Sequence, residues 1–136
     1  MITAVDTNVL VDVLEPDLRF GPGSREALRR CTREGSVIAC EVVWAELATA
    51  FGHAPDALAA ALGDIGIAYS PMTEEAALRA AACWREHVRH ARRRGRIVAD
   101  YLIGGHASVQ ADRLLTRDGG FFRRCFGHLR VLDPTE

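Results

Sequence analysis

The chain has 136 residues, of which 49% are hydrophobic and 26% charged, and its formal net charge is −1. This length suits one globular domain, so we expect a single domain over residues 1–136. The composition is too apolar for a disordered chain and too charged for a membrane bundle. No stretch approaches the roughly 18 to 20 apolar residues of a membrane span, and the first residues lack a signal-peptide pattern. We therefore expect a cytoplasmic protein with no membrane contact.

All 17 basic residues are arginine, and the chain contains no lysine. A P-loop, a Schiff-base enzyme and several phosphotransfer sites all need a lysine, so these chemistries are excluded. The cysteines form no Cys-x-x-Cys pair, which argues against a zinc knuckle or a redox dithiol. We predict buried thiols at all four positions, which are Cys31, Cys40, Cys83 and Cys125.

Short apolar segments alternate with helical patterns along the chain. Strands are predicted at residues 1–5, 36–40, 65–70, 113–116 and 129–132. Helices are predicted from about residue 8 and then over 25–34, 41–51, 55–62, 74–93, 100–111 and 121–125, with Ser24 as the N-cap of the second. This alternation predicts an α/β fold, in which a central, mostly parallel sheet carries helices on both faces.

Four acidic residues are unusual in their positions. Asp6 and Asp118 directly follow predicted strands, where open parallel sheets place their ligand crevice. Asp100 begins a predicted helix, whose dipole favours an anion there. Glu46 lies in an otherwise apolar helical segment with no basic residue within one turn. Because a buried carboxylate is costly unless it is paired or binds a metal, a cation is the simplest partner for Glu46.

Together these four carboxylates predict an all-oxygen metal site, which suits Mg²⁺ or Mn²⁺ better than zinc or copper. One ion, or two about 4 Å apart, can orient a water for attack on a phosphodiester and neutralise the phosphoryl oxygens. Setting the four acids aside leaves a net charge of +3 on the rest of the chain, which suits a polyanion. Taken singly, each acid also has a simpler interpretation: Asp6 and Asp100 as helix caps, Asp118 in a turn, and Glu46 reaching towards solvent.

Four segments resemble the signature segments of PIN-domain ribonucleases, and they are Val5–Leu10, Trp44–Leu47, Ala99–Ala107 and Leu115–Asp118. The acids in them are 40, 54 and 18 residues apart, similar to the spacing in the VapC-type toxins of toxin–antitoxin modules. The resemblance covers nearly the whole chain. It implies a Mg²⁺-dependent endoribonuclease that leaves a 5′-phosphate on the downstream fragment. Asp6 and Asp100 would be direct metal ligands, with Glu46 and Asp118 completing the acidic site.

The resemblance also implies supporting residues and partners. Thr116 would hydrogen-bond a ligand or a metal-bound water, or else cap the next turn. Asn8 would orient Asp6, or else only cap the helix that follows. The partners implied are an RNA substrate, a cognate antitoxin protein that holds the toxin inactive, and a second copy in a homodimer. Gly104 and Gly105 stand where the family commonly has alanine or another small residue, a departure that bears on helix stability.

A dense basic run lies within residues 85–96. On a helix, most of its arginines fall near one face at three- and four-residue steps, and arginine binds phosphate through paired hydrogen bonds. The alternative is an ordinary solvated helix face. The candidates for RNA contact are Arg89, Arg92, Arg93 and Arg96.

Two other function classes fit part of the pattern. Aspartyl phosphotransfer domains also place acids at strand ends, but they use a lysine, and one such family needs an aspartate where this chain has Asn8. A PIN-like fold could instead serve as a non-enzymatic protein-binding module with idle acids. A metal-dependent endoribonuclease, the toxin of a type II toxin–antitoxin pair, is the favoured hypothesis because all four acids are present.

Overall fold

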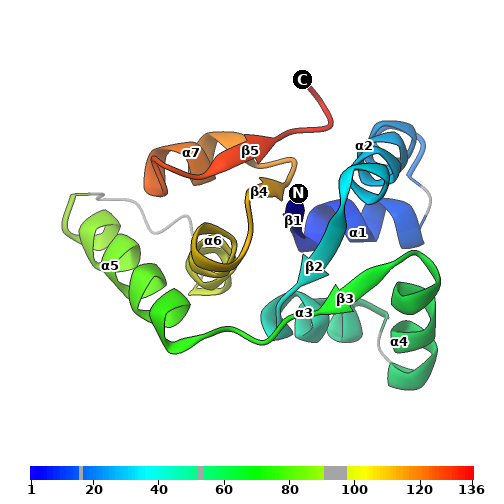
Figure 1. Cartoon of the computed structure of the whole chain (residues 1–136), viewed down its shortest axis with the longest axis horizontal. Helices are drawn as coiled ribbons and strands as arrows, with labels where there is room; N and C mark the ends of the chain where they lie inside the picture. The colour runs from blue at the N-terminus through cyan, green and yellow to red at the C-terminus, as the bar shows by residue number, and fades with distance from the viewer. Residues whose placement is uncertain (16, 52–53, 91–97) are drawn as a thin grey trace.

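A computed structural model describes residues 1–15, 17–51, 54–90 and 98–136 of the chain. Five strands form one sheet in the order β3-β2-β1-β4-β5, and every pairing among them is parallel. The strands are β1 (Ile2–Val5), β2 (Ser36–Ala39), β3 (Ile67–Tyr69), β4 (Arg113–Leu115) and β5 (Arg130–Leu132) (Figure 1). The predicted α/β fold with a parallel central sheet is confirmed.

Helices cover both faces of the sheet. The described residues form α1 (Thr7–Leu14), α2 (Gly21–Glu34), α3 (Glu41–Phe51), α4 (Pro55–Asp64), α5 (Glu74–His90), α6 (Val98–Gln110) and α7 (Gly119–Cys125). In Figure 1, α5 and α6 lie on one side of β1, and α1 and α2 lie on the other. Thr3, Ala4 and Val5 of β1 are all buried, as expected for a strand whose alternate side chains both meet helices. Among the described residues, no helix has the length and apolar character needed to cross a bilayer.

Strand β1 lies in the middle of the sheet, with β2 and β3 on one side and β4 and β5 on the other. At its carboxyl end, Val5 is in register with Leu115 of β4. The Asp6 N–H donates to the Leu115 carbonyl oxygen at 2.9 Å. The residues that follow β1 and β4 therefore leave the sheet side by side, at the reversal of strand order where such sheets bind ligands.

Helix α2 begins earlier than the sequence analysis predicted. It starts at Gly21 and has a proline in its first turn, where the missing N–H costs nothing because first-turn N–H groups have no helical partner. The predicted N-cap, Ser24, is instead buried inside the helix. Its hydroxyl donates to the Asp12 carboxylate at 2.7 Å, so this serine joins α2 to α1.

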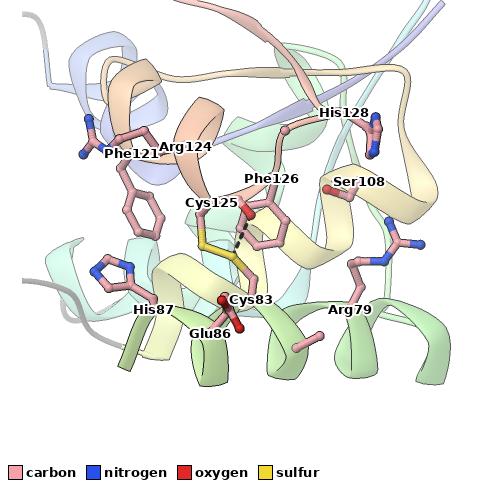
Figure 2. A pocket seen from close by; sticks show the side chains of 12 residues that line it. Arg79, Cys83, Glu86, His87, Ser108, Phe121, Arg124, Cys125, Phe126 and His128 are labelled. Carbon is pink, nitrogen blue, oxygen red and sulfur yellow. Dashed lines mark hydrogen bonds between the residues drawn. A yellow bond between two sulfur atoms is a disulfide. The ribbon is translucent and has the colours of Figure 1, made fainter. Parts of the chain in front are cut away.

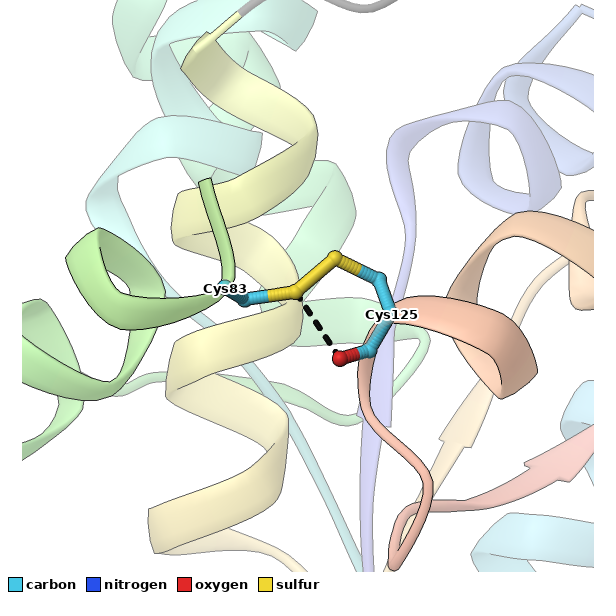
Figure 3. The surroundings of a disulfide bond; sticks show 2 residues. All are labelled: Cys83 and Cys125. Atoms are coloured by element: carbon cyan, nitrogen blue, oxygen red, sulfur yellow. Dashed lines mark hydrogen bonds between the residues drawn. A yellow bond between two sulfur atoms is a disulfide. The ribbon is translucent and has the colours of Figure 1, made fainter. Parts of the chain in front are cut away.

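The prediction of four buried thiols is half right. Cys31 and Cys40 are free and buried, whereas Cys83 and Cys125 form a disulfide (Figure 3). The disulfide joins α5 to the end of α7, across 42 residues of sequence, and its Cα atoms are 6.0 Å apart. Nothing in the spacing of these cysteines indicated the pairing, because only the packing of α7 beside α5 brings them together.

Gly104 and Gly105 let α6 approach its neighbours closely. A Cβ on Gly104 would lie 2.1 Å from the ring of Phe126, and one on Gly105 would lie 2.5 Å from the Ala76 carbonyl oxygen in α5. Atoms cannot stand so close, and the second contact is with backbone that cannot turn aside. The expected effect of these glycines is on helix stability, but their main role in the structure is in packing between helices.

We expect Gly105→Ala to lower the free energy of unfolding by about 1–3 kcal/mol, as overpacking of a filled interior commonly does. Gly63→Ala is the matched control, because Gly63 also lies in a helix but an added Cβ there meets nothing within 4 Å. That variant should be unchanged or up to about 1 kcal/mol more stable. Urea unfolding followed by circular dichroism measures both. Equal effects of the two substitutions would show that helix propensity alone governs these positions.

Candidate functional site

Asp6 lies where β1 ends and α1 begins. It is the N-cap of α1, and its Oδ1 accepts a hydrogen bond from the Thr7 N–H at 2.7 Å. The cap interpretation of Asp6 is thus confirmed, although capping does not explain its burial. Asp6 is only 6% exposed, whereas most capping residues lie at the surface. Its second oxygen, Oδ2, faces the residues that follow β4.

Thr116 follows β4 and binds the second oxygen of Asp6. Its Oγ1 donates to Asp6 Oδ2 at 2.7 Å and accepts from the Asp118 N–H at 3.0 Å. Thr116 is fully buried. The hydroxyl therefore holds the loop after β4 and the carboxylate after β1 in one arrangement.

Asn8 contacts the same loop from α1. Its Nδ2 lies 3.5 Å from Thr116 Oγ1, and its Oδ1 accepts from the Arg117 N–H at 3.2 Å. Asn8 lies inside α1, whose N-cap is Asp6, so the alternative role of Asn8 as a cap does not apply. It supports Asp6 through Thr116.

Glu46 approaches the site from α3 and is half-buried. Its Oε1 accepts a hydrogen bond from the Thr7 hydroxyl at 2.6 Å. The sequence analysis assigned Glu46 a cation as its simplest partner and missed this neutral one. The Thr7 hydroxyl satisfies one carboxylate oxygen of Glu46 and fixes the side chain in place. It does not neutralise the negative charge, so Glu46 can still attract a cation.

Asp100, in the first turn of α6, completes the group of charges around Asp6. The pKa of Asp6 is raised from 3.8 to about 6, chiefly because burial disfavours its charged form. The negative charges of Asp100 and Glu46 raise this pKa further, while the hydrogen bonds from Thr116 and the Thr7 N–H lower it. The fold therefore brings Glu46 and Asp100 near enough to Asp6 for their charges to disfavour its ionised form.

Asp118 precedes α7 and is half-buried. The Asp118 N–H donates to the Thr116 hydroxyl, and this hydroxyl donates in turn to the Asp6 carboxylate. Asp118 thus lies in the loop that Thr116 attaches to Asp6, as its predicted position after a strand implied.

These carboxylates have the oxygen chemistry that Mg²⁺ and Mn²⁺ prefer. Among the residues that the structure describes, no group of three or more His, Cys, Asp or Glu side chains is placed where it could hold a metal ion, so the four acids do not form a ready metal site. An ion that keeps several of its waters needs fewer ligands, and Mg²⁺ is usually held by one or two carboxylates. The donor set therefore fits hydrated Mg²⁺ and does not fit a structural zinc ion.

The predicted RNA-binding arginines are only partly described. Arg89 is exposed on α5, near its end at His90. The other three, Arg92, Arg93 and Arg96, lie outside the described residues, as does the predicted end of this helix. Their contact with RNA stays a prediction.

A pocket of about 430 Å³ lies between α5, α6 and α7 (Figure 2). His87 and Phe121 stand together at one side of it, and Arg79 and His128 are at the other. None of the four candidate acids is among its lining residues. The acidic site is therefore separate from this pocket and lies at the carboxyl ends of β1 and β4.

The chain matches the family model of the PIN domain over residues 3–127 and therefore belongs to the PIN-domain family. This confirms the family that the four sequence segments suggested. A search of curated protein sequences finds no significant match.

Solved structures share the fold at low sequence identity. A chain in the crystal structure of VapBC2 from Rickettsia felis, bound to a DNA fragment from their promoter, is 17% identical, with a TM-score of 0.75 and coverage of 98% of both chains. For FitAcB from Neisseria gonorrhoeae the identity is 23% and the TM-score 0.74, over 100% of this chain and 99% of that one. For VapBC-1 from nontypeable Haemophilus influenzae the values are 20% and 0.74, over 100% of both chains.

Sequence reasoning missed Thr7 and the pair formed by Asp12 and Arg117. Thr7 gave a weak signal, a hydroxyl directly after Asp6. Asp12 gave the same signal as Glu46, because it is an acid between the apolar residues of a short helix. Like Glu46, a carboxylate at this position needs a partner when it is buried, and the partner of Asp12 is the Arg117 guanidinium.

We expect Asp6→Asn to stabilise the protein at neutral pH. Because the folded-state pKa of Asp6 lies above its unfolded value, its contribution to stability is complete below pH 3.8 and is lost as the pH rises through about 6. The ionised group then costs about 3 kcal/mol, which asparagine avoids while still capping α1. Thermal unfolding should give a higher Tm for the variant at pH 7.5, with the advantage fading between pH 6 and pH 4. A lower Tm of the variant than of the wild type at pH 7.5 would contradict the conclusion that ionised Asp6 destabilises the folded protein.

Proposed function

We propose that this protein is a Mg²⁺-dependent endoribonuclease, with Mn²⁺ as an alternative ion. One observation carries the proposal: Asp6 is buried at the carboxyl end of the central strand, within the electrostatic field of Glu46 and Asp100. Such a site is unfavourable for folding and favourable for a divalent cation. Membership of the PIN-domain family supports the assignment to nucleases.

In this proposal Asp6 and Asp100 bind the ion directly, and Glu46 and Asp118 complete its surroundings. When bound, Mg²⁺ would neutralise charge on the scissile phosphate and orient a water for in-line attack, leaving a 5′-phosphate. Thr116 and the Thr7 N–H hold the Asp6 carboxylate in one orientation through its two oxygens. Such fixed orientation is what a metal ligand requires, because a free side chain must be ordered upon each binding event.

We further propose that the protein acts as the toxin of a type II toxin–antitoxin pair. Chains in the VapBC2, VapBC-1 and FitAcB structures share its fold over almost its full length. The partners would be an RNA substrate, a small antitoxin protein encoded beside the toxin, and a second copy of this chain.

Incubation of total RNA with the protein, followed by mapping of the new 5′ ends, tests the nuclease. We expect cuts with Mg²⁺ or Mn²⁺ and none with EDTA. Asp6→Asn and Asp100→Asn should each lose at least about 100-fold in rate, because each removes a charge that holds the ion. Asp56→Asn is the matched control, since Asp56 is also an acid in the first turn of a helix but is exposed on α4.

Two results would contradict the nuclease. Equal cleavage by wild type and Asp6→Asn would place the activity elsewhere or in a contaminant. No cleavage by folded protein that binds Mn²⁺ calorimetrically would assign the acidic site another chemistry.

Induced expression in a bacterial host tests the toxin role. We expect growth to stop with the wild-type chain and to continue with Asp100→Asn, because arrest would require RNA cleavage. Co-expression of the small neighbouring gene product should restore growth and should yield a complex that co-purifies. Continued growth despite cleavage in vitro would separate the nuclease from the toxin role.

A further inference from the structure

An ion pair between a buried carboxylate and a half-buried arginine joins α1 to the loop after β4. Asp12 on α1 is only 3% exposed, and Arg117 grips it with two nitrogens: Nε to Oδ2 at 2.7 Å and Nη2 to Oδ1 at 3.1 Å. Ser24 of α2 donates to the same Oδ2 at 2.7 Å. The Arg117 guanidinium also lies over the ring of Phe20, 4.0 Å from its centroid. The arginine is thus fixed by charge, by paired hydrogen bonds and by stacking.

The position of Arg117 in the sequence gives this pair its significance. It stands between Thr116, which binds Asp6, and Asp118, a candidate acid of the site. Its own N–H donates to Asn8 at 3.2 Å. Asp6, Asn8 and Asp12 belong to α1 or its cap, so this short helix holds two successive residues of the loop, Thr116 and Arg117, through three side chains.

Stability alone is a weak reason for such a pair. Burying two charges costs desolvation energy that their attraction often only repays, and apolar residues of similar size commonly do as well. A forked arginine does supply orientation, because its planar donors fit a carboxylate in one geometry. Arg113 provides a comparison, because it is a buried arginine paired with Glu34. It begins β4, at the opposite end of the strand from the loop that carries Arg117.

We propose that Arg117 and Asp12 are positioning residues, which hold Thr116 and Asp118 at the distance from Asp6 that binding of the divalent ion requires. The inference rests on the proposed function for its metal, and on the contacts above for its geometry. Arg117 acts through its neighbours in the loop and touches neither substrate nor ion.

The test compares Arg117→Gln and Asp12→Asn with Arg113→Gln. Mn²⁺ affinity is measured by calorimetry, and exchange of the Asp118 N–H with solvent deuterium is measured by NMR. All three substitutions break an ion pair that has one buried partner, so all are expected to lower Tm. Only the first two should weaken Mn²⁺ binding, by about 10-fold or more, as loss of groups behind metal ligands typically does. They should also speed Asp118 exchange and lower kcat for RNA cleavage, with KM changed less than about twofold.

A double variant and a milder one sharpen the test. Asp12→Asn combined with Arg117→Gln should bind Mn²⁺ no more weakly than Arg117→Gln alone, because both act through one pair. If Arg117→Gln does not fold, Arg117→Lys serves instead. Lysine keeps the positive charge but cannot form the paired hydrogen bonds of the guanidinium, so this variant should still weaken Mn²⁺ binding.

The positioning role of Arg117 and the nuclease activity are tested independently by these measurements. Equal effects of Arg117→Gln and Arg113→Gln on Mn²⁺ affinity and Asp118 exchange would overturn the positioning role, even if the wild type cleaves RNA. The expected difference in a protein that cleaves no RNA would uphold the positioning role while refuting the nuclease. If the wild type binds no Mn²⁺, the role in metal binding is wrong.

Discussion

The hydrogen bond from Thr116 Oγ1 to Asp6 Oδ2 is the contact on which the acidic site depends. It joins the residues that follow two neighbouring strands, and it exists because β1 and β4 are parallel and in register at Val5 and Leu115. A slip of one residue would turn the side chains to the opposite face of the sheet. The same hydroxyl accepts the Asp118 N–H, so the sheet register determines where a second acid stands.

The ionised acidic site lowers the free energy of unfolding of the protein. Burial and the nearby charges of Asp100 and Glu46 raise the pKa of Asp6, and two hydrogen bonds from described residues, Thr116 and Thr7, oppose that effect. Folded proteins tolerate such local cost chiefly at functional positions. Of the two buried carboxylates among the described residues, Asp12 differs from Asp6 because an arginine neutralises it. The contrast between a compensated and an uncompensated buried carboxylate distinguishes a supporting residue from a candidate ligand.

Close packing on one side of the sheet places the third acid. Helix α6 contacts β1 and β4 and carries Asp100 in its first turn. Gly104 and Gly105 let its central turns lie against Phe126 and the backbone of α5 at distances that no Cβ would permit. A local feature that weakens an isolated helix therefore fixes the position of the helix in the fold, and with it the position of a charge.

Local patterns in the chain are enough to predict the fold class and the location of the acids. Alternating strands and helices imply a parallel sheet, and acids that follow strands of such a sheet meet at one edge whatever the details of packing. The tertiary structure alone decided which side chains are partners. Arg117 and Asp12 are 105 residues apart, and Cys83 and Cys125 are 42 apart, so no local periodicity could pair them. Ser24 shows the same limit within a helix, because its hydroxyl could cap α2 or bind Asp12, and only the packing of α2 on α1 selects between them.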